Sequence, residues 1–107
     1  MEQRTVVTAH PYYYDPGTIR VRAGTPVRIR IKAYDQRAYG FRVEGLGLRA
    51  RVPAGGDSEI RFTPESPGTY TIRNDLDCGE PCRSMRGLLI VEPRQGSGGG
   101  GRQSAGR

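Results

Sequence analysis

The stretch DPGTIRVRAGTPVRIRI, residues 15–31, decides the fold class, because apolar and polar residues alternate on both sides of a turn. Apolar residues occupy every second position around the turn at residues 24–26: Ile19 and Val21 before it, and Val27, Ile29 and Ile31 after it. Successive side chains of a β-strand point to opposite faces of its sheet. The period of two therefore predicts two strands, each with one buried face and one solvated face.

The same pattern continues outward over most of the chain. Short apolar segments alternate with turn signals rich in Pro, Gly and Asp, and no segment keeps a helical period. The remaining expected strands contain Val6 and Val7, Phe41 and Val43, Leu46 to Val52, Ile60 and Phe62, Tyr70 and Ile72, and Leu88 to Val91. Seven or eight short strands with regular turns predict an all-β fold, an antiparallel sandwich or barrel.

Length and composition fit one small domain followed by a tail. The chain has 107 residues, 35% of them hydrophobic, with no Trp and 2 Phe, so its core must be thin. We assign residues 1–94 to the domain. Residues 95–107 are rich in Gly, Ser, Gln and Arg, and we predict a flexible tail or linker there, because such a composition cannot offset its ordering entropy.

The formal net charge of +6 comes almost entirely from arginine, with Lys32 the only lysine. Many arginines alternate with apolar residues, as in residues 19–31, which is typical of the solvated face of a strand. An acidic protein or an anionic membrane surface are further possible partners for this charge. We predict no nucleic-acid partner, because the chain has no arginine-rich helix and no recognisable RNA-binding motif.

The chemistry is concentrated in residues 74–87, NDLDCGEPCRSMRG, which lie between two expected strands. Cys78, Cys82 and Met85 fall within eight residues of one another, so their sulfur atoms can converge. Thiolate and thioether ligands are soft and select Cu(I) over hard ions such as Mg²⁺. Two cysteines this close indicate a metal site, a redox pair or one local disulfide. No nucleophile is paired with a histidine base, since His10 is the only histidine, so we do not expect the chain to be an enzyme on its own.

A family resemblance runs through the chain from about residue 5 to residue 93. The ligand-loop region, from Phe62-Thr63-Pro64 through Thr69-Tyr70, Cys78-Gly79 and Met85-Arg86-Gly87 to Val91-Glu92-Pro93, resembles the final strands of the copper-bearing domain of cytochrome c oxidase subunit II. Residues 9–14, 15–27 and 39–48 are similar to that family's earlier segments. The resemblance implies a cupredoxin-like Greek-key β-sandwich of seven to eight strands.

The resemblance also implies which positions face the metal. Cys78 matches the second cysteine of the family's CuA site and Met85 matches its methionine. Asn74 takes the place of the first cysteine, Cys82 that of the loop histidine, and Tyr39 that of the upstream histidine. A binuclear CuA centre needs two cysteines and two histidines at these positions, so it cannot form here.

A type 1 blue-copper site cannot form either, because it needs two histidines and His10 is expected to be a surface or packing residue. The predicted metal ligands are therefore Cys78, Cys82 and Met85, with Tyr39 as a fourth. The expected cofactor is copper, with Cu(I) favoured by the sulfur ligands.

Three functions follow as alternatives. The first is a copper-binding domain for electron transfer or copper handling, with a redox protein or oxidase subunits as partners. The resemblance implies an extracytoplasmic or periplasmic location and a membrane anchor outside this sequence. The second is a metal-free structural or interaction module in which Cys78 and Cys82 form a disulfide or stay inert. The third is a thiol–disulfide module, which is disfavoured because the spacing is not C-x-x-C and no βαβ pattern surrounds it.

Overall fold

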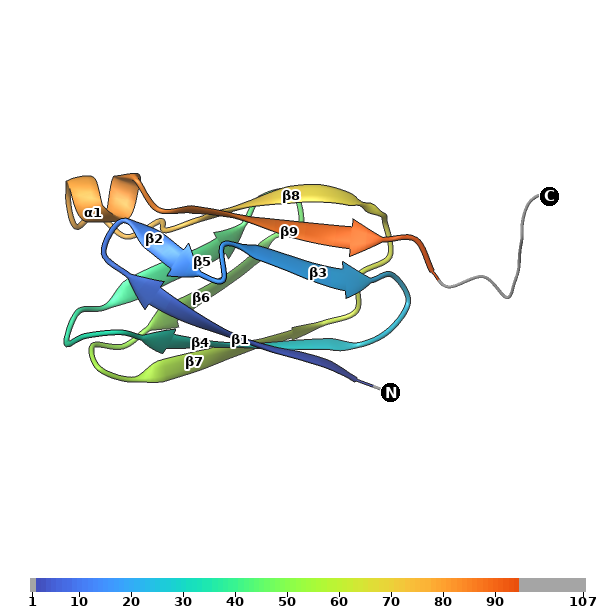
Figure 1. The fold of residues 1–107 in the computed structure, drawn as a ribbon, viewed down its shortest axis with the longest axis horizontal. Helices are drawn as coiled ribbons and strands as arrows, with labels where there is room; N and C mark the ends of the chain where they lie inside the picture. The colour runs from blue at the N-terminus through green and yellow to red at the C-terminus, as the bar shows by residue number, and fades with distance from the viewer. Residues whose placement is uncertain (1, 95–107) are drawn as a thin grey trace.

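The computed structural model describes residues 2–94, which form a two-layered β-sandwich (Figure 1). Its strands and its single helical turn are β1 (Gln3–His10), β2 (Tyr13–Asp15), β3 (Thr18–Arg22), β4 (Val27–Ala33), β5 (Tyr39–Val43), β6 (Leu48–Val52), β7 (Asp57–Phe62), β8 (Gly68–Arg73), α1 (Glu80–Arg83) and β9 (Arg86–Glu92). The all-β sandwich expected from the sequence is confirmed. The predicted tail at 95–107 lies outside the described residues.

One sheet has the strand order β2-β1-β4-β7, and the other has the order β3-β9-β8-β5-β6. Most neighbours are antiparallel, as expected, but β1 pairs with β4 and β3 pairs with β9 in parallel. The purely antiparallel arrangement suggested by the sequence is therefore wrong for these two pairs. Parallel neighbours need a crossover connection, and here the chain visits the other sheet between β1 and β4 and again between β3 and β9.

The core lies between the two sheets and is built from the alternating apolar residues. Val27, Ile29 and Ile31 of β4 are fully buried, whereas Arg30 between them is exposed. Facing side chains come from the other sheet, where Phe41 of β5 is also fully buried. The period of two in the sequence thus gave the correct inward and outward faces for β4.

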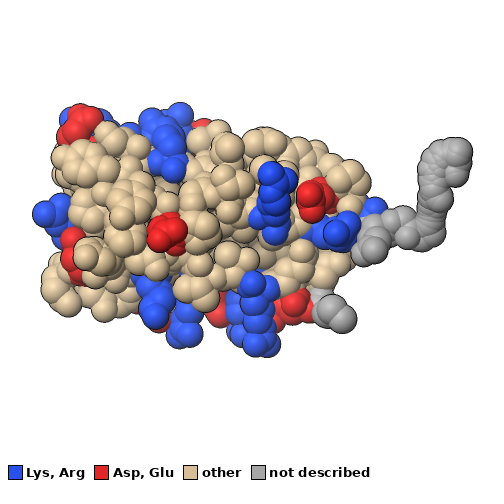
Figure 2. All heavy atoms as spheres, viewed as in Figure 1, with Lys and Arg blue, Asp and Glu red and all other residues tan. Residues whose placement is uncertain are grey.

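In the view of Figure 2, charged side chains project along the lower border and from the left part of the upper border. On the five-stranded sheet, four arginines stand in register on four adjacent strands: Arg49, Arg42, Arg73 and Arg86. Two of these have carboxylate partners, Arg49 with Asp75 and Arg73 with Glu44. Within residues 2–94, no helix has the length and hydropathy needed to cross a membrane.

Two short elements were not expected from the sequence. Strand β2 (Tyr13–Asp15) raises the described strands to nine, and α1 is one helical turn within the loop between β8 and β9. A segment of three residues is too short to show a period of two, which explains why β2 escaped prediction. Both elements lie at the same end of the sandwich, where the loop 74–85 is located (Figure 1).

Candidate metal site in the loop between strands β8 and β9

The loop of residues 74–85 is folded by its own backbone hydrogen bonds. Gly79 has φ 88°, a left-handed conformation that glycine adopts without steric cost, and its carbonyl accepts from the N–H groups of Cys82 and Arg83. Pro81 fits the first turn of α1 because the N–H it lacks would have no partner inside the helix. The carbonyl of Pro81 accepts from the N–H of Tyr12 at 3.1 Å, which fixes the loop to the turn between β1 and β2.

Cys78 and Cys82 are joined by a disulfide across this turn, with their Cα atoms 5.5 Å apart. The two halves of the disulfide differ in exposure. Cys82 is fully buried, whereas Cys78 is exposed at the end of the sandwich. In this state neither sulfur is a thiolate, so neither can serve as a thiolate ligand to a metal.

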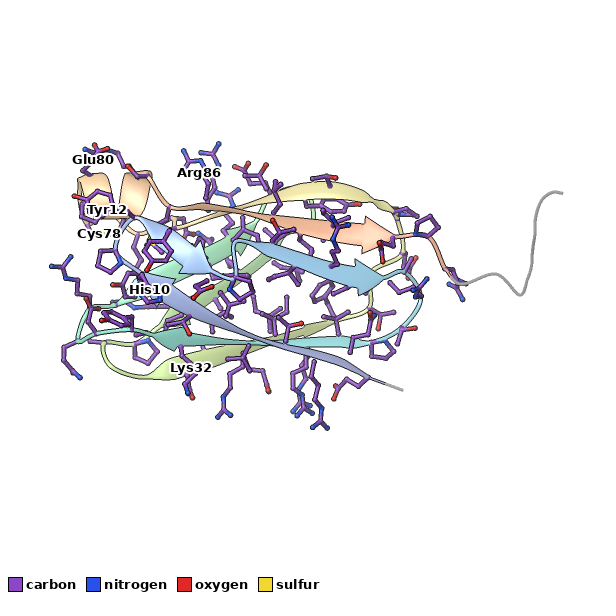
Figure 3. All side chains as sticks on the ribbon, in the orientation of Figure 1. His10, Tyr12, Lys32, Cys78, Glu80 and Arg86 are labelled. Atoms are coloured by element: carbon purple, nitrogen blue, oxygen red, sulfur yellow. A yellow bond between two sulfur atoms is a disulfide. The ribbon has the colours of Figure 1, made fainter. Side chains whose placement is uncertain are left out.

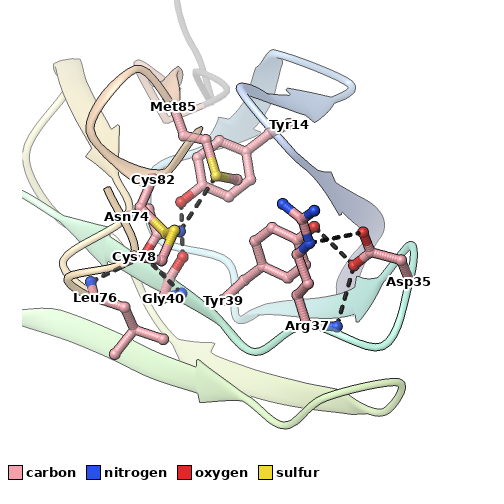
Figure 4. Close-up of a disulfide and its surroundings, with 10 residues drawn as sticks. All are labelled: Tyr14, Asp35, Arg37, Tyr39, Gly40, Asn74, Leu76, Cys78, Cys82 and Met85. Atoms are coloured by element: carbon pink, nitrogen blue, oxygen red, sulfur yellow. Dashed lines mark hydrogen bonds and ion pairs between the residues drawn. A yellow bond between two sulfur atoms is a disulfide. The ribbon is translucent and has the colours of Figure 1, made fainter. Parts of the chain in front are cut away.

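Asn74 and Met85 contact each other next to the disulfide (Figure 4). The side-chain Oδ1 of Asn74 accepts from the backbone N–H of Gly40 at 2.8 Å and of Leu76 at 2.9 Å. Its Nδ2 donates to the sulfur of Met85 at 3.2 Å. Met85 is fully buried and Asn74 nearly so. The position that holds a cysteine in the resembled family therefore carries an amide that links β5, the loop and Met85.

Tyr14 of β2 closes the other side of this cluster. Its hydroxyl donates to the carbonyl of Gly40 at 2.7 Å, and its ring stacks edge-on against Phe41. Burial is the largest of the effects that raise the pKa of Tyr14 well above its ordinary value, and the carboxylate of Asp75 raises it further. The positive charge of Arg86 lowers this pKa by a smaller amount. Tyr14 is therefore a neutral phenol that satisfies a buried carbonyl.

Tyr39, the fourth predicted ligand, lies in β5 with its ring buried and its hydroxyl directed to Asp35 (Figure 4). The hydroxyl donates to Oδ1 of Asp35 at 2.8 Å. Burial and then this hydrogen bond raise the pKa of Tyr39 to about 12. Arg37 pairs with the same carboxylate at 3.6 Å. Metal binding by Tyr39 stays a prediction and would require the phenol to leave Asp35.

His10 is a packing residue, as the sequence suggested. Its ring stacks on Tyr13 with centroids 4.5 Å apart and lies against Tyr34 at 4.3 Å. Figure 3 places His10 and Tyr12 at the same end of the sandwich as Cys78. Tyr12, Tyr13 and Tyr34 are each more than half exposed, so an aromatic surface adjoins the loop.

The loop thus brings together the three predicted sulfur ligands, Cys78, Cys82 and Met85, and Figure 4 shows them around Asn74. A CuA or type 1 centre does not fit these residues, because both need two histidines and His10 is held between tyrosines. In residues 2–94, no group of three or more His, Cys, Asp and Glu side chains is placed to hold a metal ion. Three sulfur donors fit a soft ion such as Cu(I), but only with the disulfide open.

Asn74 and Tyr14 are the residues whose roles the sequence did not reveal. Asn74 was matched to a ligand position, but its hydrogen bonds to Gly40 and Met85 depend on contacts between strands distant in sequence. The available signal was a polar amide at a ligand position of a sulfur-rich loop, since an amide that becomes buried there needs partners.

The sequence matches the family model of the Cupredoxin-like domain over residues 1–91. A search of curated protein sequences returned no significant match. Among solved structures, the chain is similar to one from a heme-copper terminal oxidase dimer, with 25% identity and a TM-score of 0.72. That match covers 84% of this chain and 65% of the oxidase chain, so this chain spans slightly less than two thirds of its length.

Two further similar structures support the fold alone. One is the metal-binding domain of the Cu(I)-exporting P-type ATPase CopA of Streptococcus pneumoniae, with 22% identity, a TM-score of 0.68, and coverage of 84% of this chain and 85% of that chain. The other is auracyanin A, a blue copper protein of Chloroflexus aurantiacus, with 15% identity, a TM-score of 0.71, and coverage of 86% and 100%. The cupredoxin fold expected from the resemblance is confirmed.

Proposed function

Because this chain belongs to the cupredoxin-like domain family, we propose that it binds copper as Cu(I) through Cys78, Cys82 and Met85 when its disulfide is reduced. Its role is copper handling or one-electron transfer within an oxidase-type assembly. The observation that carries the proposal is the gathering of three sulfur atoms in one loop of a family related to copper-binding proteins.

The donor set supports Cu(I) over other oxidation states and metals. Two thiolates and a thioether are soft ligands, and Cu(I) is the soft ion that such sites select. Bound copper would supply one-electron chemistry. The chain itself supplies a dry surrounding, because Cys82 and Met85 are fully buried. To serve as a ligand, the sulfur of Met85 must exchange the hydrogen bond from Asn74 for the metal.

The similarity to a heme-copper oxidase chain supports the proposed partners and location. We propose that oxidase subunits or a redox protein contact the loop end of the sandwich. We also propose an extracytoplasmic location near a membrane. The exposed Tyr12, Tyr13 and Tyr34 beside the loop suit such a contact, since tyrosine is enriched at protein interfaces.

The test is Cu(I) titration of the protein after anaerobic reduction with a phosphine, in competition with a chromogenic Cu(I) chelator. We expect about one Cu(I) per chain in the reduced protein and none in the disulfide form. Cys78→Ser and Cys82→Ser should each abolish competitive binding, and Met85→Leu should weaken it. Lys32→Gln, which changes an exposed residue on the other sheet, is the matched control. Equal binding by the oxidised protein and both serine variants would refute the proposal.

A metal-free structural module is the second candidate, and two observations favour it. The disulfide consumes both thiols, and the amide of Asn74 already satisfies Met85 and the N–H of Gly40. Such a module would need no reduction to reach its working state. The same titration separates the candidates, because a metal-free module gives no copper binding above the serine variants even after complete reduction.

A further inference from the structure

A pocket of about 460 Å³ opens beside the disulfide on the exposed side of Cys78. Its lining combines side chains from the β4–β5 loop, from β5 and β6, and from the sulfur-bearing loop: Arg37, Ala38, Tyr39, Arg51, Leu76, Asp77, Cys78 and Pro81. Pockets of a few hundred Å³ hold small molecules. One lining residue, Cys78, is therefore half of a disulfide, a bond that can react with thiols.

The disulfide presents only one of its sulfur-bearing residues to the pocket. Cys78 is exposed and lines the pocket, whereas Cys82 is fully buried and is absent from the lining. A thiolate opens a disulfide by attacking one sulfur, and the other sulfur leaves. Access therefore fixes the direction of exchange, with attack at Cys78 and departure of Cys82.

The lining of the pocket contains a cation, Arg51, that can attract an anionic ligand. Arg37 and Arg51 line the pocket together with the carboxylate of Asp77, and Arg37 is already paired with Asp35 at 3.6 Å. Arg51 makes no ion pair with any residue in 2–94, although its neighbour on the same face of β6, Arg49, pairs with Asp75. A guanidinium without an ion-pair partner in the lining of a pocket attracts carboxylates and thiolates.

We propose that this pocket binds a small thiol carrying a carboxylate, and that this thiol opens the Cys78–Cys82 disulfide. In the first step the thiolate of the small molecule bonds to Sγ of Cys78, the sulfur–sulfur bond breaks, and Cys82 leaves as a thiolate with the bonding electron pair. In the second step the thiolate of another small molecule attacks the sulfur that the first small molecule contributed to the mixed disulfide, that sulfur–sulfur bond breaks, and Cys78 leaves as a thiolate. The products are the oxidised dimer of the small thiol and two cysteine thiolates.

The inference rests on the proposed function for what the opened loop does next. Reduction would convert the closed loop into the sulfur ligand set for Cu(I), so the pocket would control when the site can load. The opening reaction itself involves no metal. Its kinetics can therefore be tested on the disulfide form without copper, whether or not the copper proposal holds.

The first experiment measures the rate of disulfide opening by three thiols that differ in charge. In its thiolate form, 3-mercaptopropionate carries two negative charges and 2-mercaptoethanol carries one. The thiolate of cysteamine has no net charge, because its ammonium group balances the sulfur. Aliquots are quenched with an alkylating agent, and the free thiols are counted by mass. Each rate is divided by the rate of the same thiolate with a small uncharged disulfide, which removes differences in intrinsic reactivity.

We expect the normalised rate to be about tenfold higher for 3-mercaptopropionate than for cysteamine at low salt, and this ratio should shrink as salt is added. Arg51→Gln should lower the ratio by about threefold, and Asp77→Asn should raise it. Arg61→Gln is the matched control, because it makes the same charge change on the other sheet. Equal normalised rates for the three thiols, or equal effects of Arg51→Gln and Arg61→Gln, would overturn the proposal.

The second experiment locates the attacked sulfur. Cys82→Ser and Cys78→Ser each leave one thiol, and each variant is treated with the oxidised dimer of 3-mercaptopropionate. We expect the mixed disulfide to form readily on Cys78 and at least about tenfold more slowly on Cys82, because Cys82 is fully buried. Circular dichroism confirms that both variants are folded. Comparable labelling of the two folded variants would show that access does not direct the exchange and would refute that step.

Discussion

Asn74 is the residue whose replacement tests the description of the loop most severely. Its Oδ1 accepts two backbone N–H groups, from Gly40 and Leu76, and its Nδ2 donates to Met85. Asn74→Ala removes all three interactions and leaves the N–H of Gly40 without its buried partner. An unsatisfied buried donor costs about 1–3 kcal/mol, and the lost hydrogen bond from the N–H of Leu76 together with lost packing brings the expected destabilisation to about 3 kcal/mol.

Such a change should lower the Tm by about 10–25 °C in a domain of this size. The free energy of unfolding is measured by urea denaturation with the disulfide intact, followed by circular dichroism. Thr69→Ala, at an exposed polar position of the neighbouring strand β8, is the control and should change stability by less than about 0.5 kcal/mol. A loss below about 1 kcal/mol for Asn74→Ala would show that the amide does not hold β5 to the loop.

Three other predictions follow from the same structure. Replacing both Cys78 and Cys82 by serine should reduce the free energy of unfolding by about 2 kcal/mol, because the disulfide closes a short loop; an unchanged urea midpoint would contradict this. The pKa of Tyr39, raised to about 12, means that its contribution to stability is complete below pH 10 and is lost as the pH rises toward 12. When the pH is raised, the difference in absorbance at 295 nm between the wild type and Tyr39→Phe should therefore have its midpoint near pH 12. A midpoint near pH 10 would refute the raised pKa of Tyr39. Arg42 faces an arginine on each neighbouring strand, so Arg42→Gln should stabilise the domain by about 0.5 kcal/mol at low salt, and this gain should disappear at high salt.

The sandwich could be predicted from the sequence because its strands obey a local rule. Where apolar residues alternate, as in Val27 to Ile31, the faces are set by the geometry of a single strand. Which strands become neighbours in a sheet is not determined by such a local pattern. The parallel contacts of β1 with β4 and of β3 with β9 depend on how the chain crosses between sheets, and no period in the sequence encodes them.

The sequence predicted that three sulfur-bearing residues share one loop, but it did not predict the redox state of the two cysteines. The spacing of Cys78, Cys82 and Met85 was enough to place three sulfurs in one loop. The spacing allowed a disulfide as well as two free thiols, and only the fold shows the bond, with one cysteine buried and the other exposed. The orientation of Tyr39 toward Asp35 is equally a matter of packing, because Asp35 lies in a loop of irregular backbone just before β5.

The central claim is that reduced Cys78, Cys82 and Met85 together hold Cu(I). Its most direct test is X-ray absorption at the copper K-edge on the reduced, Cu(I)-loaded protein, beside the Met85→Leu variant. We predict a first shell that contains three sulfur scatterers, with one sulfur fewer in the variant. A shell containing imidazole nitrogen, or a shell unchanged by Met85→Leu, would contradict it.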